Sequence, residues 1–245
     1  MKNSFIEFTN HYIYNDDTVI IKHDFNGDIN SINFDCNIVS IIFTNYDDII
    51  NIDKSINNKK YFKYNEFKNS KFNRLVDNLP NTLLNLSFDS QFNQPINNLS
   101  HTLLNLSFGF SFNQMVDNLP FGILNLSFGM KFNQTVDKLP FGILNISFGK
   151  YFNQLLENLP NSLTSIVIID IRCYCEFNKE LNYLPKSICK ICLPFNYNQE
   201  IKNIPSSLKK IYCSELYANE YKFNDDIKIV LFKLINNRII GLNDI

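Results

Sequence analysis

Apolar residues recur along the chain with a period of 20 residues, far longer than the period of one strand or helix. Five consecutive copies each open on phenylalanine, which we number position 0 of the repeat. Positions 4, 7, 11, 14 and 16 of each copy are then apolar as well. The opening residues are Phe72, Phe92, Phe112, Phe132 and Phe152. A fixed period of this length predicts a stack of similar coils.

The spacing of positions 11, 14 and 16, L-x-x-L-x-L, predicts one short strand in each coil. Side chains alternate along a strand, so positions 14 and 16 face one side and positions 13 and 15 the other. Proline recurs at position 8, as in Pro120, and belongs in the return segment because it has no N–H for a sheet. The predicted fold class is therefore a leucine-rich-repeat-like solenoid: a parallel β-sheet on one face, turn-rich return segments and few helices.

The core of this solenoid should contain two columns of phenylalanine rings, at positions 0 and 16. Position 1 is always asparagine in the regular copies, and its amide can both donate and accept hydrogen bonds. We therefore expect a structural ladder that satisfies turn backbone groups, formed by Asn93, Asn113, Asn133 and Asn153.

Weaker copies flank the regular ones, and the sequence predicts about eight to ten coils in total. The predicted segments are 1–24 (N-terminal cap), 25–71 (degenerate repeats), 72–171 (five regular repeats), 172–213 (two divergent repeats) and 214–245 (a degenerate repeat and C-terminal cap). Caps are expected because end coils would otherwise expose apolar faces and open strand edges.

The phrase Phe-Asn-Gln-x-(Ile/Val)-x-x-Leu-Pro-x-x-Leu-x-x-Leu-x-Phe resembles the FNIP repeat, a relative of the leucine-rich repeat found in social amoebae and giant DNA viruses of amoebae. The resemblance implies a non-catalytic protein–protein interaction scaffold. Family members often carry an N-terminal F-box, which docks onto a ubiquitin-ligase adaptor, but residues 1–24 are too short and strand-like for one. The alternative is substrate recognition in a ubiquitin-ligase assembly whose docking element lies on another chain.

Charge and composition narrow the class of partner. The chain has 23 basic and 24 acidic residues, a net charge of −1 that does not suit a nucleic-acid binder. No apolar run is long enough for a signal peptide or a membrane span, so we expect a cytoplasmic protein, in the host cytoplasm if viral. Its six cysteines are then free thiols. We expect an unknown protein partner, no nucleic acid, no membrane, no cofactor and a monomeric chain.

Positions that differ between copies are free to bind a partner. Positions 18 and 19, just after the strand, differ most, and they predict a partner-binding ridge of Phe110, Met130, Lys131, Lys150 and Tyr151. Alternatively, these side chains pack together and only seal the turn. Position 3, as in Met115, also varies, and we expect it to pack beside the phenylalanine column.

The outward row of the strands offers a second candidate surface. It is small, neutral and repetitive, and it lacks the aromatic and arginine side chains that usually carry binding energy. A merely solvated sheet is the alternative interpretation. The row's candidate residues are Asn105, Asn125 and Asn145.

A zinc site is the one candidate for metal chemistry. Four thiolates can close a tetrahedral site, and Cys173, Cys175, Cys189 and Cys192 lie close together in the sequence. Cys189 and Cys192 also fit ordinary repeat positions 12 and 15, so the residues equally allow buried thiols without a metal. No catalytic motif is present, and we expect no enzyme activity.

Overall fold

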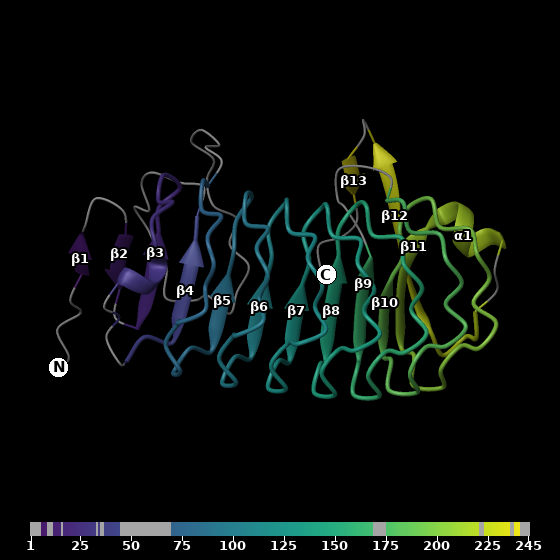
Figure 1. Cartoon of the computed structure of the whole chain (residues 1–245). Coiled ribbons are helices and arrows are strands. Elements are labelled where there is room, and N and C mark those ends of the chain that lie inside the picture. Colours follow the sequence, from purple (N-terminus) through teal and green to yellow (C-terminus); the bar gives the residue numbers. More distant parts are fainter. Residues whose placement is uncertain are drawn as a thin grey trace.

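The repeated strands pair in sequence order into one 13-stranded sheet (Figure 1). The computed structural model describes residues 6–8, 12–15, 17–32, 34, 37–44, 70–168, 175–220, 223–235 and 238–240. The strands are β1 (Ile6–Phe8), β2 (Tyr12–Asn15), β3 (Thr18–Ile21), β4 (Ser40–Phe43), β5 (Asn85–Ser87), β6 (Asn105–Ser107), β7 (Asn125–Ser127), β8 (Asn145–Phe148), β9 (Ser165–Ile168), β10 (Lys190–Cys192), β11 (Lys210–Ser214), β12 (Lys228–Ile235) and β13 (Arg238–Ile240).

The strands from β3 to β12 run parallel, with equivalent repeat positions side by side. Leu86 lies opposite Leu106, which lies opposite Leu126, because each regular coil returns after 20 residues. Strands at the two ends pair antiparallel: β1 with β2, β2 with β3, and β12 with β13. These ten parallel strands, counted from β3 to β12, confirm the predicted solenoid and its number of coils.

Two columns of stacked phenylalanine rings run through the core, as the sequence predicts. At position 0, the ring centroid of Phe112 lies 6.1 Å from those of Phe92 and Phe132. At position 16, the Phe108 and Phe128 centroids are 5.7 Å apart. The columns touch each other, since Phe108 and Phe112 stack with centroids 3.7 Å apart. All five rings are buried, and each contributes about 1.5–3 kcal/mol of burial free energy.

Successive coils fan apart with distance from the sheet. Neighbouring strands in a sheet lie about 4.8 Å apart. The step from coil to coil rises to 5.7 Å at the position 16 rings and to 6.1 Å at the position 0 rings. The step between coils is therefore larger at the position 0 rings than at the position 16 rings, and larger at both than the usual spacing of strands.

The position 0 column continues beyond the regular coils in both directions. Phe25 stacks on Phe72 at 5.9 Å, and β4 pairs directly with β5. Phe177 stacks on Phe152 at 5.9 Å and on Tyr197 at 6.1 Å. Within segment 25–71, residues 45–69 lie outside the described residues, so the degenerate repeats predicted there stay a prediction.

The asparagines at position 1 stack from coil to coil. The backbone N–H of each donates to the side-chain Oδ1 of the preceding one, at 2.8–2.9 Å, through Asn73, Asn93, Asn113, Asn133 and Asn153. The glutamine at position 2 often adds a second donor to the same oxygen, as Gln134 does at 3.2 Å from Asn113. Each coil thereby satisfies polar groups in the turn of the next one.

In the residues that the structure describes, helices are few and short. They are the 3-10 turn η1 (Ile29–Ser31) and the helix α1 (Glu215–Glu220), which directly follows β11. Tyr217 of α1 is buried between Tyr197 and Phe223, with ring centroids 5.4 and 6.0 Å away, so the rings continue past Tyr197 in a tilted arrangement. In the described ranges, no helix has the length and apolar character needed to cross a bilayer.

Candidate interaction surfaces

The outward row of strand asparagines bonds to itself. The side-chain amide of Asn105 donates to Asn85 at 2.6 Å, that of Asn125 to Asn105 at 2.6 Å, and that of Asn145 to Asn125 at 2.7 Å. Each amide thus uses a donor and an acceptor along the sheet. A partner would have to bind mainly the remaining polar atoms of a flat surface, which holds few anchors.

The predicted ridge does gather at one rim of the stack. The Lys131 ammonium lies 5.3 Å from the centroid of the Phe110 ring, and that of Lys150 lies 5.2 Å from the Tyr151 ring. Phe110 is 43% exposed, whereas Met130 and Tyr151 are half-buried. The ridge side chains thus cover the turn and are at the same time partly exposed. One face of the Phe110 ring and one face of the Tyr151 ring already contact a lysine ammonium of the same chain.

Position 3 does not pack beside the phenylalanine column, and that expectation was wrong. Met115 is 72% exposed, and Leu75 and Leu155 are exposed as well. The neighbouring position 4 is buried, as in Val116. Consecutive residues of an extended segment point to opposite sides, so burying position 4 turns position 3 toward solvent.

Position 9 carries the most exposed aromatic side chains in the described part of the chain. Phe121 is 73% exposed and Phe141 81%, in adjacent coils. The equivalent residue one coil earlier is His101, also exposed. Sequence reasoning missed the pair, although the change from Asn81 through His101 to phenylalanine at one repeat position was a visible signal.

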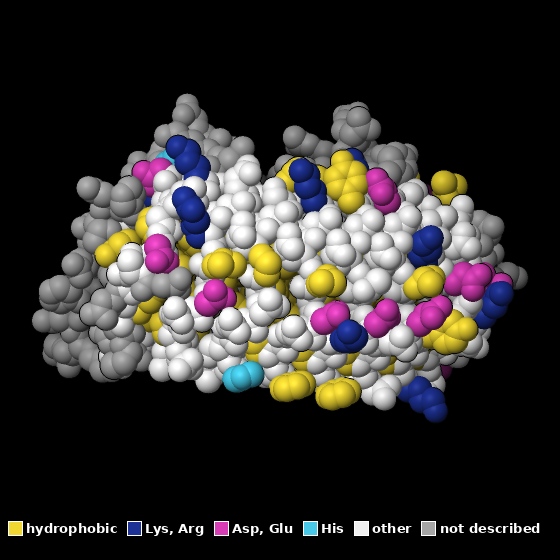
Figure 2. Space-filling view, viewed as in Figure 1, with side chains coloured by type: hydrophobic (Ala, Val, Ile, Leu, Met, Phe, Trp, Pro, Cys, Tyr) yellow, Lys and Arg dark blue, Asp and Glu magenta, His cyan; other side chains and the backbone are white. Residues whose placement is uncertain are grey.

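Positions 3 to 9 together form the outer face of the return segments, which we call the return face. Figure 2 shows this face, with rows of hydrophobic and acidic side chains running along the stack. The acidic row is at position 5: Asp77, Asp117, Asp137 and Glu157. The row lies between the apolar side chains of position 3 and the aromatic pair of position 9.

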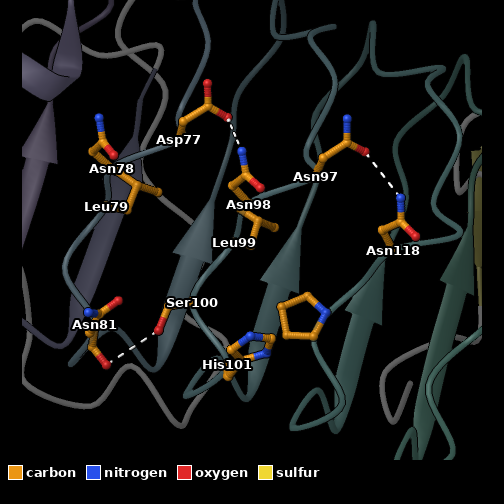
Figure 3. A pocket seen from close by; sticks show the side chains of 11 residues that line it. Asp77, Asn78, Leu79, Asn81, Asn97, Asn98, Leu99, Ser100, His101 and Asn118 are labelled. Carbon is orange, nitrogen blue, oxygen red and sulfur yellow. Dashed lines mark hydrogen bonds between the residues drawn. The ribbon is translucent and has the colours of Figure 1, made fainter.

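A groove of about 520 Å³ crosses the return face between positions 5 and 9 (Figure 3). Asparagine side chains make up much of its lining, and Asp77 is its one carboxylate. The amide of Asn98 donates to Asp77 at 3.3 Å, and that of Asn118 to Asn97 at 3.5 Å. These bonds link successive coils and hold the wall of the groove in place.

The candidate zinc cysteines differ in their surroundings. Cys175 and Cys192 are buried, Cys189 is exposed, and Cys173 lies outside the described residues. The Cys189 thiol donates to the carbonyl of Ser187 at 3.3 Å. Across the described ranges, no three His, Cys, Asp or Glu side chains gather in a group that could hold a metal ion.

Cys192 belongs to a small second core on the outward side of the sheet. It is buried with Tyr212 and Phe232, against which Val167, Phe195 and Val230 pack. Burial raises the pKa of the Cys192 thiol to about 12, although Lys190 acts in the opposite direction. Burial also raises the pKa of Cys213 to about 12. Both thiols are therefore protonated at neutral pH and poor nucleophiles.

Thiol labelling checks this difference. At pH 8, iodoacetamide should modify Cys189 rapidly, while Cys192 and Cys213 react at least tenfold more slowly because both are buried and protonated. Peptide mass spectrometry of a labelling time course gives the three rates separately. Denaturant should make the three rates similar; equal rates in the folded protein would contradict the described burial.

No protein-family model matches the sequence, and no curated protein matches it. Among solved structures, the chain is similar to CroV588 of a giant virus, whose crystal structure carries the description "a novel circular LRR protein structure". The two sequences are 28% identical, with a TM-score of 0.59 over 94% of this chain and 33% of CroV588. The chain has a leucine-rich-repeat-like solenoid fold and spans about a third of that protein's length.

Proposed function

We propose that the protein is a non-catalytic scaffold that binds a partner protein through the return face. The observation that carries the proposal is the exposure of Phe121 and Phe141 at 73% and 81%. The fold does not use these rings, since position 9 is polar in the other regular coils: Asn81, His101 and Asn161. Exposed aromatic side chains on a rigid frame are typical binding anchors.

The frame holds these anchors with little loss of freedom on binding. The position 8 prolines next to them, Pro120 and Pro140, are buried. The backbone N–H of Ile123 donates to the Pro120 carbonyl at 3.3 Å, and that of Ile143 to Pro140 at 3.4 Å. Each phenylalanine therefore lies inside a closed turn, and preorganisation of this kind favours affinity.

The proposals for the repeat type, the oligomeric state and the cellular compartment rest on the amino-acid sequence. We propose that the coils are FNIP-type repeats and that the protein acts as a monomer in the cytoplasm. None of the four described cysteines forms a disulfide, which supports a reducing compartment. Recruitment of ubiquitin-ligase adaptors stays a prediction of the family resemblance, and their co-purification would test it.

Partner capture tests the scaffold role. The double variant Phe121→Ser, Phe141→Ser should retain less than about a tenth of the partner bound by the unchanged protein, because two aromatic anchors are lost. The measurement is quantitative mass spectrometry of proteins captured by the tagged chain from amoeba extract. Circular dichroism should show an unchanged fold.

Two further variants complete this experiment. Leu216→Ser removes an apolar side chain of similar exposure, 74%, from α1 and should leave capture unchanged. The ridge variant Phe110→Ser, Met130→Ser, Tyr151→Ser tests the other candidate surface. Loss of capture with the ridge variant alone would move the binding surface from the return face to the ridge. Failure of the unchanged chain to capture any protein specifically would contradict the scaffold role.

A further inference from the structure

The carboxylates of position 5 are largely unneutralised. Lys138 pairs with Asp117 at 2.9 Å, and the contact raises the pKa of that lysine. Asp77 and Asp137 accept hydrogen bonds from the neutral amides of Asn98 and Asn158, both at 3.3 Å. No described lysine or arginine forms an ion pair with Asp77, Asp137 or Glu157. A net negative stripe therefore runs across a chain of almost zero net charge.

Apolar side chains flank this stripe on both sides. Leu75, Met115 and Leu155 lie on the position 3 side, and Phe121 and Phe141 lie on the position 9 side; all five are exposed. Acidic and apolar rows side by side are complementary to a segment that carries both positive charge and apolar side chains.

The spacing of the rows suits a helix lying along the stack. At the position 0 rings, which are buried inside the stack, successive coils are displaced by 6.1 Å. Four residues of an α-helix rise about 6 Å. Side chains at i, i+4 and i+8 of such a helix would therefore meet successive coils in step, for instance Asp117, Asp137 and Glu157.

We propose that the return face binds a cationic amphipathic helix of a partner protein. Its lysines or arginines contact the position 5 carboxylates, and its apolar side chains contact positions 3 and 9. This inference rests on the proposed scaffold function and names the chemistry of the partner.

Two synthetic peptides test the charge requirement. The first is a fluorescein-labelled amphipathic helix of lysine and leucine, about 16 residues long so that it spans ~24 Å of the stack. In the second, glutamate replaces every lysine. Fluorescence anisotropy with the full chain should show salt-sensitive binding of the lysine peptide and at least tenfold weaker binding of the glutamate peptide. Equal binding of both peptides, or binding of neither, would overturn the proposal.

Charge variants locate the binding surface. The triple variant Asp77→Asn, Asp137→Asn, Glu157→Gln should weaken binding of the lysine peptide about tenfold. The matched control Asp17→Asn, Glu176→Gln, Glu215→Gln makes the same change in net charge at exposed residues outside positions 3 to 9, and should bind like the unchanged protein. If both variants lose peptide binding equally, the loss comes from the changed net charge of the protein. The proposed site on the return face would then be wrong.

Two other occupants are outcomes of the same test. Residues 54–69 of this chain hold five lysines and one glutamate, together with four aromatic residues. If Lys59→Gln, Lys60→Gln, Lys63→Gln strengthens peptide binding tenfold, this chain's own segment is the occupant and the partner assignment fails. If sedimentation shows a dimer that the triple variant loses, a second copy is the occupant and the assignment also fails.

The outcomes for the inference and for the scaffold role are separable. Partner capture could depend on Phe121 and Phe141 while the chain shows no preference for the lysine peptide. That result would support the scaffold role and contradict the inference of a cationic helix. Lysine-peptide binding that persists in the triple variant would place the cation-binding surface elsewhere and overturn the inference in the same way.

Discussion

Phe112→Ala is expected to lower the free energy of unfolding by about 3–5 kcal/mol. The ring is fully buried and stacks on Phe92, Phe132 and Phe108. Neighbouring coils hold the surrounding rings in both columns, so the site cannot collapse around a smaller side chain. Urea unfolding followed by far-ultraviolet circular dichroism measures the change.

Phe121→Ala is the matched control, because it makes the same chemical change at position 9 of the same coil. That ring is 73% exposed, so the variant should lose less than about 0.5 kcal/mol. Similar losses in Phe112→Ala and Phe121→Ala would contradict the assignment of one phenylalanine to the core and the other to the surface.

Gly129→Ala should destabilise the protein by about 1–3 kcal/mol through overpacking. A Cβ at this position would lie 1.9 Å from the carbonyl oxygen of Gly109 in the preceding coil. The contact is with backbone, so neither coil can relieve it by a side-chain rotation. The shift of the urea midpoint at constant slope gives the loss.

Gly142→Ala provides the comparison within the repeat. Its Cβ would meet the carbonyl oxygens of Phe121 and Ile123 at 3.2 and 3.6 Å, distances that a small adjustment accommodates. We expect a change within about 1 kcal/mol of zero, since fewer unfolded conformations offset the tight contact. If Gly142→Ala lowers the free energy of unfolding as much as Gly129→Ala does, the close approach of neighbouring coils is not the reason for glycine at position 17.

The sequence was sufficient to predict the coil stack because the repeat encodes its own packing. Phe92, Phe112 and Phe132 occur at one fixed spacing, and only stacked coils bring such residues into contact. Strand position followed from the alternation of buried Leu126 and Phe128 around outward-facing Ser127. Each of these inferences needs only contacts between neighbouring coils.

Exposure on the return face was harder to predict. The variable residues of positions 3 and 9 have the same apolar character as core residues, so composition alone does not separate Met115 or Phe121 from the core. Their exposure depends on how the return segment rotates between the buried positions 4 and 8. That rotation is a property of the assembled coil.

The sequence analysis did not predict the second core around Cys192. Cys192 and Tyr212 occupy outward strand positions, where four regular coils have serine and the fifth has Val167. Phe195, which follows Cys192 closely in the chain, and Phe232 of β12, the strand paired with β11, pack around them. These residues lie outside the buried positions of the repeat, so the pattern of core residues did not predict that they pack together on the outward side of the sheet.

A crystal structure of the protein tests the central claim most directly, because that claim is geometric. The account predicts electron density for Phe92, Phe112 and Phe132 as consecutive stacked rings with centroids 6.1 Å apart, and for Phe121 and Phe141 in solvent. Rings of the first three that do not contact in sequence order, or Phe121 and Phe141 buried within the same chain, would contradict it.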